Sequence, residues 1–190
     1  FQEKNVPLLV EDTEMGQQFG SISGAQMVEF EGESRTMPWM RALQEDTNRE
    51  RREAAWRASW GRRAEDQESL DDLYDAMVSN RTKIGVNAGY KDYVGYAFAS
   101  KQRFDYTPED CQAFHQAAED VFVPLLRKIH DDRRQQLGLD ALRPWDLAVD
   151  SSGQAPLRPF RTEAELVQGC GKMFTALDPE LGGLFARLQD

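Results

Sequence analysis

The chain has 190 residues, of which 40% are hydrophobic and 29% charged, and its formal net charge is −10. This length suits one domain or two very small ones, and the apolar content is too high for a disordered chain. The acidic balance argues against nucleic acid and anionic membranes as partners. No apolar run approaches the roughly 20 residues of a bilayer span, so we expect no membrane association.

The cysteines and the chain ends indicate the setting of the protein. Cys111 and Cys170 are too few for a disulfide framework, so we expect two free thiols, a reducing compartment and a cytoplasmic location. The chain opens at Phe1 in a polar stretch that lacks the pattern of a signal peptide, and it stops at Asp190 in an expected helix. From both ends we expect a fragment of a longer protein.

The first 37 residues predict a helix followed by a β-hairpin. Residues 1–20 carry a ragged apolar stripe at helical spacing, and Gly-Ser-Ile-Ser-Gly at 20–24 predicts a break after it. Polar and apolar residues then alternate, with Glu-Gly-Glu at 31–33 as a turn. We therefore expect strands near 25–30 and 34–37.

Helix signals dominate from residue 38 onward. The expected helix starts are Thr36 with Pro38, Thr47 or Asn48, Ser69, residue 92, Thr107 with Pro108, and Thr162 with Glu165. The residues expected to weaken or end a helix are Gly61, Gly89, Gly138 and the pair Asp178–Pro179. Pro124 lies inside the longest of these helices and predicts a kink, because proline removes one backbone donor. Residues 142–160 contain several prolines and are expected to be irregular.

Together these patterns predict a mainly α fold, a multi-helix array with one short β-hairpin near residues 25–37. We expect a single helical domain over residues 1–190, in which 1–37 form the N-terminal helix and the hairpin and 38–190 form helices. The sequence contains no internal repeat and no low-complexity tract.

Candidate metal chemistry is sparse. His115 and Glu119 are four residues apart in one expected helix, so they share a face. The pair is either half of a metal site or a hydrogen-bonded surface pair, and the second is favoured because zinc needs three or four converging ligands. Gln112 and Arg127 stand three residues before the two histidines, which excludes the Glu-x-x-His motif of di-iron bundles.

Other classes of site are missing from the sequence. It contains no Gly-x-Ser-x-Gly and no phosphate-binding loop. The arginine-rich segment 49–63 is interleaved with Glu50 and Glu53, which favours a solvated helix face over a nucleic-acid site. Trp56 and Trp60 stand four apart, which is more typical of core packing than of a ligand platform. We expect neither a catalytic residue nor a metal ligand in this chain.

A collinear series of motifs nevertheless resembles a known family. The motifs are SISGAQMVEFEGESRTMP (21–38), DTNRERREAAWRA (46–58), SNRTKIGVNAGYKDY (79–93), KQRFDYTPEDCQAF (101–114), VFVPLLRKIHDDRRQQLGLDALRPWD (121–146) and FTALDPELGGLF (174–185). In this order they resemble the oligoendopeptidase F branch of the thimet-oligopeptidase-like zinc metallopeptidases, over nearly the whole chain. Arg-Phe-Asp-Tyr-Thr-Pro, Leu-Gly-Leu-Asp and Arg-Pro-Trp-Asp are the most specific motifs.

The resemblance implies a zinc-dependent enzyme that hydrolyses short peptides. Members carry His-Glu-x-x-His on a helix and a further Glu as third zinc ligand, whereas this chain lacks that motif and corresponds to the region upstream of it. The resemblance therefore implies zinc in the full-length enzyme, no zinc bound to this chain, and an inactive fragment that walls or supports a helical channel. Its implied partners are a short peptide and the missing catalytic region of the same protein.

Contacts with peptide are expected in the irregular parts of the chain. The candidate substrate-binding residues are Arg103, Asp105, Tyr106, Trp145 and Asp146. For each of them, capping or packing of a helix end is the alternative. An apolar face left exposed by the missing region would also favour a homo-oligomer. The alternatives to a peptidase segment are a non-catalytic helical interaction or scaffold domain and a metal-binding bundle built on His115 and Glu119.

Overall fold

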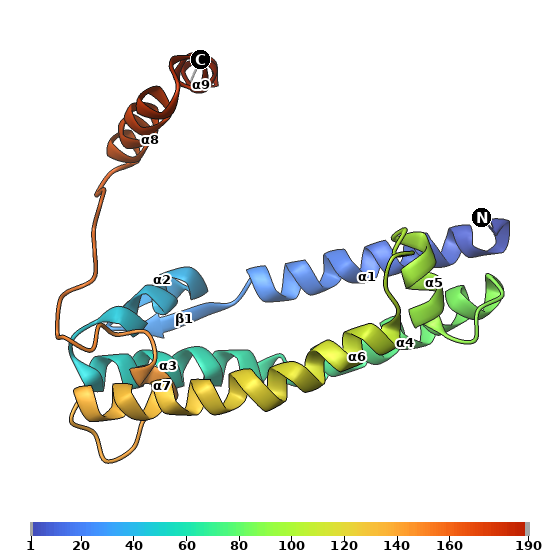
Figure 1. Cartoon of the computed structure of the whole chain (residues 1–190), viewed down its shortest axis with the longest axis horizontal. Helices are drawn as coiled ribbons and strands as arrows, with labels where there is room; N and C mark the ends of the chain where they lie inside the picture. Colours follow the sequence, from blue (N-terminus) through green and yellow to red (C-terminus); the bar gives the residue numbers. More distant parts are fainter. Residues whose placement is uncertain (1, 189–190) are drawn as a thin grey trace. The chain divides into compact units, whose positions relative to one another are not determined.

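A computed structural model describes residues 2–188 of the chain, which divides into two compact units, Phe1–Gln154 and Ala155–Asp190. The expectation of a mainly α fold with one short hairpin is confirmed (Figure 1). The single domain expected over residues 1–190 stays a prediction, and the two units are described separately. Among the described residues, none of the helices combines the length and the apolar character that a membrane span requires.

The first unit holds the hairpin and most of the helices. Its elements in chain order are η1 (Glu3–Asn5), α1 (Val6–Gly24), β1 (Met27–Phe30), β2 (Glu33–Thr36), α2 (Met37–Ala42), η2 (Leu43–Glu45), α3 (Arg49–Glu65), α4 (Gln67–Asn87), α5 (Tyr93–Ser100), α6 (Pro108–Ala117), η3 (Ala118–Phe122), α7 (Val123–Gln136) and η4 (Pro144–Asp146). Here η3 is a short π-helix and the other η elements are short 3-10 helices.

The break expected at residues 20–24 is wrong, because α1 continues through both glycines to Gly24. Glycine costs about 1 kcal/mol in a helix relative to alanine, which a long helix packed against a neighbour can absorb. Strand β1 begins two residues later than expected and β2 one residue earlier, and they pair with Met27 opposite Thr36 and Phe30 opposite Glu33. The turn is only two residues long, and both adopt positive φ, 54° at Glu31 and 81° at Gly32.

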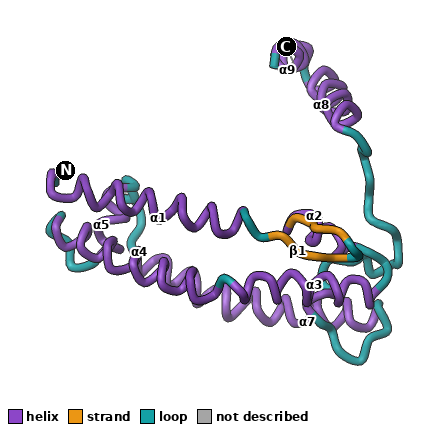
Figure 2. The backbone as a smooth tube through the Cα atoms, turned by 180° about the vertical axis from the view of Figure 1, so that it is seen from behind, coloured by secondary structure: helices purple, strands orange, loops and turns teal. Residues whose placement is uncertain are grey.

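Helices α1 and α4 lie side by side and antiparallel (Figures 1 and 2). Asn5 Nδ2 donates a hydrogen bond of 2.9 Å to the Ile84 carbonyl, and Asn80 Nδ2 donates one of 2.8 Å to the Leu8 carbonyl. Both asparagines are buried. Each helix therefore inserts one amide side chain against the backbone of the other.

The hydrophobic core of the first unit lies between the hairpin, α2, η2 and α3 (Figure 2). Its fully or nearly fully buried members are Val28, Met40, Leu43 and Ala55. Because the hairpin contributes one inward residue and three helical segments contribute the rest, this core fixes the start of α3 against the strands.

The boundaries between α3, α4 and α5 differ from the expected ones. Gly61 does not end α3, which continues to Glu65. A Cβ at Gly61 would face open space. Helix α4 begins two residues before Ser69, whose hydroxyl donates to the Asp66 carbonyl at 2.9 Å. At the far end of α4, a Cβ on Gly85 would stand 2.7 Å from the Asp92 carbonyl oxygen. Only glycine allows α5 to approach this closely.

The long helix α6–η3–α7 begins and ends as the sequence predicts. At its start, Thr107 Oγ1 accepts from the Asp110 amide while the Asp110 carboxylate accepts from the Thr107 amide, which is a capping box. At its end, Gly138 has a φ of 65° and the Leu139 amide donates to the Arg134 carbonyl, as in a Schellman motif. A short π-helix, η3, lies directly before α7, and Pro124 stands in the first turn of α7. The kink expected at Pro124 stays a prediction.

The second unit is a helical hairpin of α8 (Glu163–Leu177) and α9 (Pro179–Arg187). The Thr162 hydroxyl accepts from the Glu165 amide, which confirms the expected helix start. The expected break at Asp178–Pro179 is also confirmed, and there the Asp178 carboxylate accepts from the Glu180 amide at the start of α9. The rings of Phe174 and Phe185 lie 4.9 Å apart between the two helices.

Candidate functional site

Asp146, one of the predicted peptide-binding residues, is completely buried at the end of η4. Its carboxylate accepts two hydrogen bonds of 2.9 Å from the Arg49 guanidinium, one to each oxygen. It also accepts one of 3.0 Å from Arg52 and one of 3.0 Å from the Arg143 backbone amide. Every oxygen of this carboxylate is therefore held by an internal donor.

The geometry follows from the sequence of α3. Asn48 caps the helix by accepting from the Arg51 amide, and Arg49 and Arg52 follow at i and i+3 on one face. A cation in the first turn of a helix is disfavoured by the macrodipole unless a carboxylate compensates it. Asp146 supplies that charge from 94 and 97 residues further along the chain.

Burial raises the pKa of Asp146, but hydrogen bonds from Arg49, the Arg143 amide and Arg52 outweigh it and hold the pKa below its ordinary value. The carboxylate is therefore ionised at neutral pH. Because all its oxygens are engaged by donors, Asp146 has neither the free lone pair of a metal ligand nor the access of a general base.

Arg52 extends this arrangement to the backbone. Only 3% of the residue is exposed, yet its guanidinium donates to the carbonyls of Trp145 at 2.8 Å, Asp46 at 2.8 Å and Thr47 at 3.2 Å. The expectation that the arginine-rich segment is a solvated helix face is thus wrong for Arg52. A buried guanidinium is tolerated here because it is paired and hydrogen-bonded.

Trp145 is buried between aromatic and cationic side chains of α3. Its ring lies 5.4 Å from the ring of Trp56 and 5.1 Å from the guanidinium of Arg57. Trp56 is half-buried in this stack, whereas Trp60 is mostly exposed. The prediction that both tryptophans pack in the core therefore holds for Trp56 only. We call Arg49, Arg52, Trp56, Trp145 and Asp146 the Asp146 cluster.

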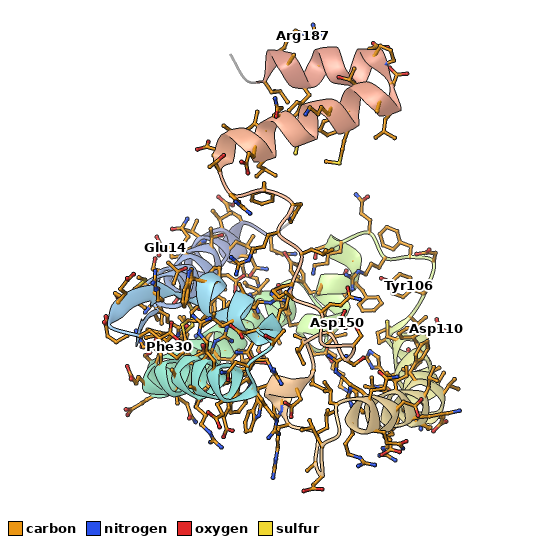
Figure 3. All side chains as sticks on the ribbon, turned by 90° about the vertical axis from the view of Figure 1, so that its left-hand side faces the viewer. Glu14, Phe30, Tyr106, Asp110, Asp150 and Arg187 are labelled. Atoms are coloured by element: carbon orange, nitrogen blue, oxygen red, sulfur yellow. The ribbon has the colours of Figure 1, made fainter. Side chains whose placement is uncertain are left out.

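The other predicted peptide-binding residues lie on the exposed loop between α5 and α6 (Figure 3). The Arg103 guanidinium lies 5.6 Å from the Phe98 ring and 6.0 Å from the Tyr106 ring, and those two rings lie 5.5 Å apart. Asp105 is exposed beside them. The structure thus brings Arg103 and Tyr106 together beside Phe98 of α5, while Trp145 and Asp146 contact side chains of α3. Contact of any of the five with peptide stays a prediction.

His115 and Glu119 lie on α6 and η3 and line an apolar hollow of about 460 Å³ together with Phe122, Leu126 and Ile129. Within residues 2–188, no group of three or more His, Cys, Asp or Glu side chains is arranged to hold a metal ion. The described residues therefore do not fit a zinc site, and His115 with Glu119 supply at most two ligands. Cys111 and Cys170 are free thiols, as expected.

The buried amides of Asn5 and Asn80 and the buried Arg52 escaped sequence reasoning. Asparagine and arginine are usually exposed, so their positions alone gave no reason to expect burial. One signal was present for Arg52, because the start of α3 carries three arginines against one acid, which opposes the helix dipole and favours a carboxylate partner.

The geometry above can be compared with that of known proteins. The sequence model of peptidase family M3 matches residues 42–177, which is well over half of the chain. The chain belongs to peptidase family M3. The matched segment of this M3 chain includes the whole Asp146 cluster, the loop that carries Arg103 and Tyr106, and the long helix α6–η3–α7. The resemblance to the oligoendopeptidase F branch is thereby confirmed.

Solved structures resemble this M3 chain along its whole length. A protein assigned as an oligoendopeptidase F from Bacillus anthracis str. Ames is 25% identical, with a TM-score of 0.89 over 100% of this chain and 35% of its own. PZ peptidase A with an inhibitor is 26% identical, with a TM-score of 0.91 over 99% of this chain and 33% of its own.

A further structure assigned as an oligoendopeptidase F, 24% identical with a TM-score of 0.91, covers 99% of this chain and 33% of its own and shows likeness of fold alone. The M3 chain thus spans about a third of the solved chains that it resembles. No curated protein matches it.

Proposed function

We propose that this M3 chain is a segment of a zinc-dependent oligoendopeptidase that hydrolyses short peptides. The observation that carries the proposal is the family match over residues 42–177. It is supported by the likeness to PZ peptidase A with an inhibitor and to a protein assigned as oligoendopeptidase F. Since the chain spans about a third of these proteins, the rest of the enzyme supplies the metal and the catalytic groups.

The role that we assign to this segment is structural. The Asp146 cluster ties the start of α3 to the loop after α7 through donors that come from widely separated parts of the chain. Arg133 adds a further tie, because its guanidinium donates to the carbonyls of Asp146 and Val149. Such a rigid helical frame suits the wall or support of a peptide channel. Zinc binds elsewhere in the full-length enzyme, and the segment alone is inactive.

Within this segment, the loop with Arg103, Asp105 and Tyr106 is the better candidate for peptide contact. Its side chains are exposed and combine a cation, a carboxylate and aromatic faces, which can meet peptide termini and side chains. The Asp146 carboxylate is fully hydrogen-bonded to internal donors, and the buried Trp145 ring packs against Trp56. They act as positioning residues. The cytoplasmic location stays a prediction.

A quenched fluorescent peptide tests the proposal. Residues 1–190 alone are expected to show no turnover with added zinc, whereas the full-length protein cleaves the peptide and loses activity with a chelator. Zinc-dependent cleavage by residues 1–190 would contradict the assigned role. In the full-length protein, Tyr106→Ala is expected to raise KM severalfold with little change in kcat. Tyr74→Ala is the control, because Tyr74 is an exposed tyrosine on α4 outside the loop.

The second candidate is a non-catalytic helical interaction or scaffold domain. One observation favours it, namely the large apolar side chains exposed on α6, η3 and α7. The coding sequence of the gene distinguishes the two candidate functions. A His-Glu-x-x-His codon pattern downstream of Asp190 supports the peptidase, and an open reading frame without it supports the scaffold.

A further inference from the structure

The helix α6–η3–α7 is attached to the rest of its unit mainly at its C-terminal end. There the Arg133 Nε donates to the Asp146 carbonyl at 2.7 Å, and the Ser151 hydroxyl donates to Gln136 at 2.6 Å. Towards the N-terminal end, the side chains of α6 and η3 make their hydrogen bonds within the helix itself. Most of the helix thus has one long side that no described element covers.

That side is apolar. We call Ala118, Phe122, Val123, Leu125, Leu126 and Ile129 the apolar stripe. Phe122 is 64% exposed and Ile129 is 51% exposed, which is far more than such side chains show in a finished core. The residues recur over three turns at helical spacing, so they form one continuous surface.

The opposite side of the same helix is polar, because Asp120, Arg127 and Asp131 recur there at helical spacing. A helix with one apolar and one charged side is built to cover a core. At the N-terminal end of the stripe, only His115 and Glu119 offer polar groups. The surface therefore suits a large apolar partner and lacks the paired charges that would hold both ends of a short peptide.

The comparisons favour the rest of a longer chain as the partner of the stripe. The solved relatives superpose on this chain over 99–100% of its length, while about two thirds of each relative lies outside the superposed part. A contiguous apolar surface on a segment of a larger fold is normally covered by the remainder of that fold. A second copy is the weaker candidate, because each copy carries a net charge of −10 and the copies repel one another.

We infer that the apolar stripe is the surface on which the remaining part of the longer peptidase chain packs, an inference that rests on the proposed function. Phe122, Leu126 and Ile129 then lie at the centre of an intramolecular interface, and the exposed side with Arg127 stays in solvent.

Site-specific photo-cross-linking in the full-length protein tests this inference. A benzophenone amino acid replaces Phe122 or Ile129 on the stripe, and Arg127 on the opposite side serves as control. Cross-linked peptides are identified by mass spectrometry after illumination. We expect both stripe positions to link to residues outside 1–190 at least tenfold more often than position 127.

Links from the stripe to a second copy of residues 1–190, or no links above the control, would overturn the inference. Peptidase activity is measured on the same preparations and does not depend on the cross-link. A protein that cross-links as expected but cleaves no peptide retains the interface and refutes the proposed peptidase function. A protein that cleaves peptide without such cross-links retains the function and refutes the interface.

Discussion

The Asp146 cluster and the apolar stripe invert the usual distribution of polar and apolar side chains. In the cluster, a carboxylate and a guanidinium are buried and satisfied by partners from distant parts of the chain. On the stripe, phenylalanine, leucine and isoleucine stand in solvent. The buried charges of the cluster are thus paired, whereas the apolar side chains of the stripe are not buried. The Asp146 cluster therefore stabilises the unit itself, whereas the apolar stripe is a surface available for contact with a further part of a larger structure.

The largest effect is expected from breaking the cluster at its centre. Asp146→Asn keeps the shape but removes the charge, so Arg52 is left buried without a counter-ion. Loss of one partner from a buried ion pair costs about 3–5 kcal/mol. All four tryptophans lie in the first unit, so urea unfolding followed by tryptophan fluorescence reports its stability.

Asp131→Asn is the matched control for this change. Asp131 also pairs with an arginine, Arg134, at 2.9 Å, but its side chain is 54% exposed. Exposed ion pairs contribute at most about 1 kcal/mol. Equal losses in the free energy of unfolding from the two substitutions would show that the burial of Asp146 does not strengthen its contribution to stability.

A second comparison distinguishes the two arginines. Arg52→Met is expected to cost about 3 kcal/mol, because it leaves a buried carboxylate with one partner and deprives three carbonyls of a donor. Arg49→Met is expected to cost about 1 kcal/mol, since the Arg49 side chain is 41% exposed and Arg52 remains in place. The same fluorescence assay measures both, and a larger loss for Arg49 would contradict the order of burial.

The stability of the first unit should also depend on pH. Because the pKa of folded Asp146 lies below its unfolded value, its contribution is present above about pH 4 and is lost as the pH falls through the folded pKa. Urea unfolding at pH 6 and pH 3 should show a loss that is smaller in Asp146→Asn than in the wild type. The same loss in both proteins would assign the pH dependence to other carboxylates.

The smallest effect is expected on the stripe. Phe122→Ser removes a large apolar side chain, but one that is mostly exposed, so the free energy of unfolding of residues 1–190 should change by no more than about 0.5 kcal/mol. The contrasting variant is Ile84→Ala, since Ile84 is completely buried and its truncation should cost about 2–5 kcal/mol. A large loss in Phe122→Ser would mean that the stripe already has a partner.

Local chemistry accounts for what the sequence predicted of the fold. Thr107, Gly138 and Asp178 end or begin helices through hydrogen bonds that span at most five residues, so their types suffice to place them. The wrong break at 20–24 has the opposite origin. The cooperativity of the long helix α1 keeps helical a segment whose own residues favour a turn.

The candidate site was predictable only in part. Trp145 and Asp146 stand out in the sequence as an irregular motif, but the residues that decide their role lie on α3, 89 to 97 residues away in the chain. The burial of Arg52 follows from that long-range contact. Arg103 and Tyr106, which interact within one loop, were found together by sequence reasoning because their contact is local.

The paired amides between α1 and α4 carry a consequence for how this protein can change in length. Asn5 reaches the backbone at Ile84 and Asn80 reaches it at Leu8, so two bonds running in opposite directions clamp one short stretch of each helix. Adding or deleting a single residue between the two contacts in either helix would rotate one amide away from its acceptor by about 100°. A change of length between Asn5 and Leu8 is therefore expected to be poorly tolerated, because the two bonds fix the spacing there.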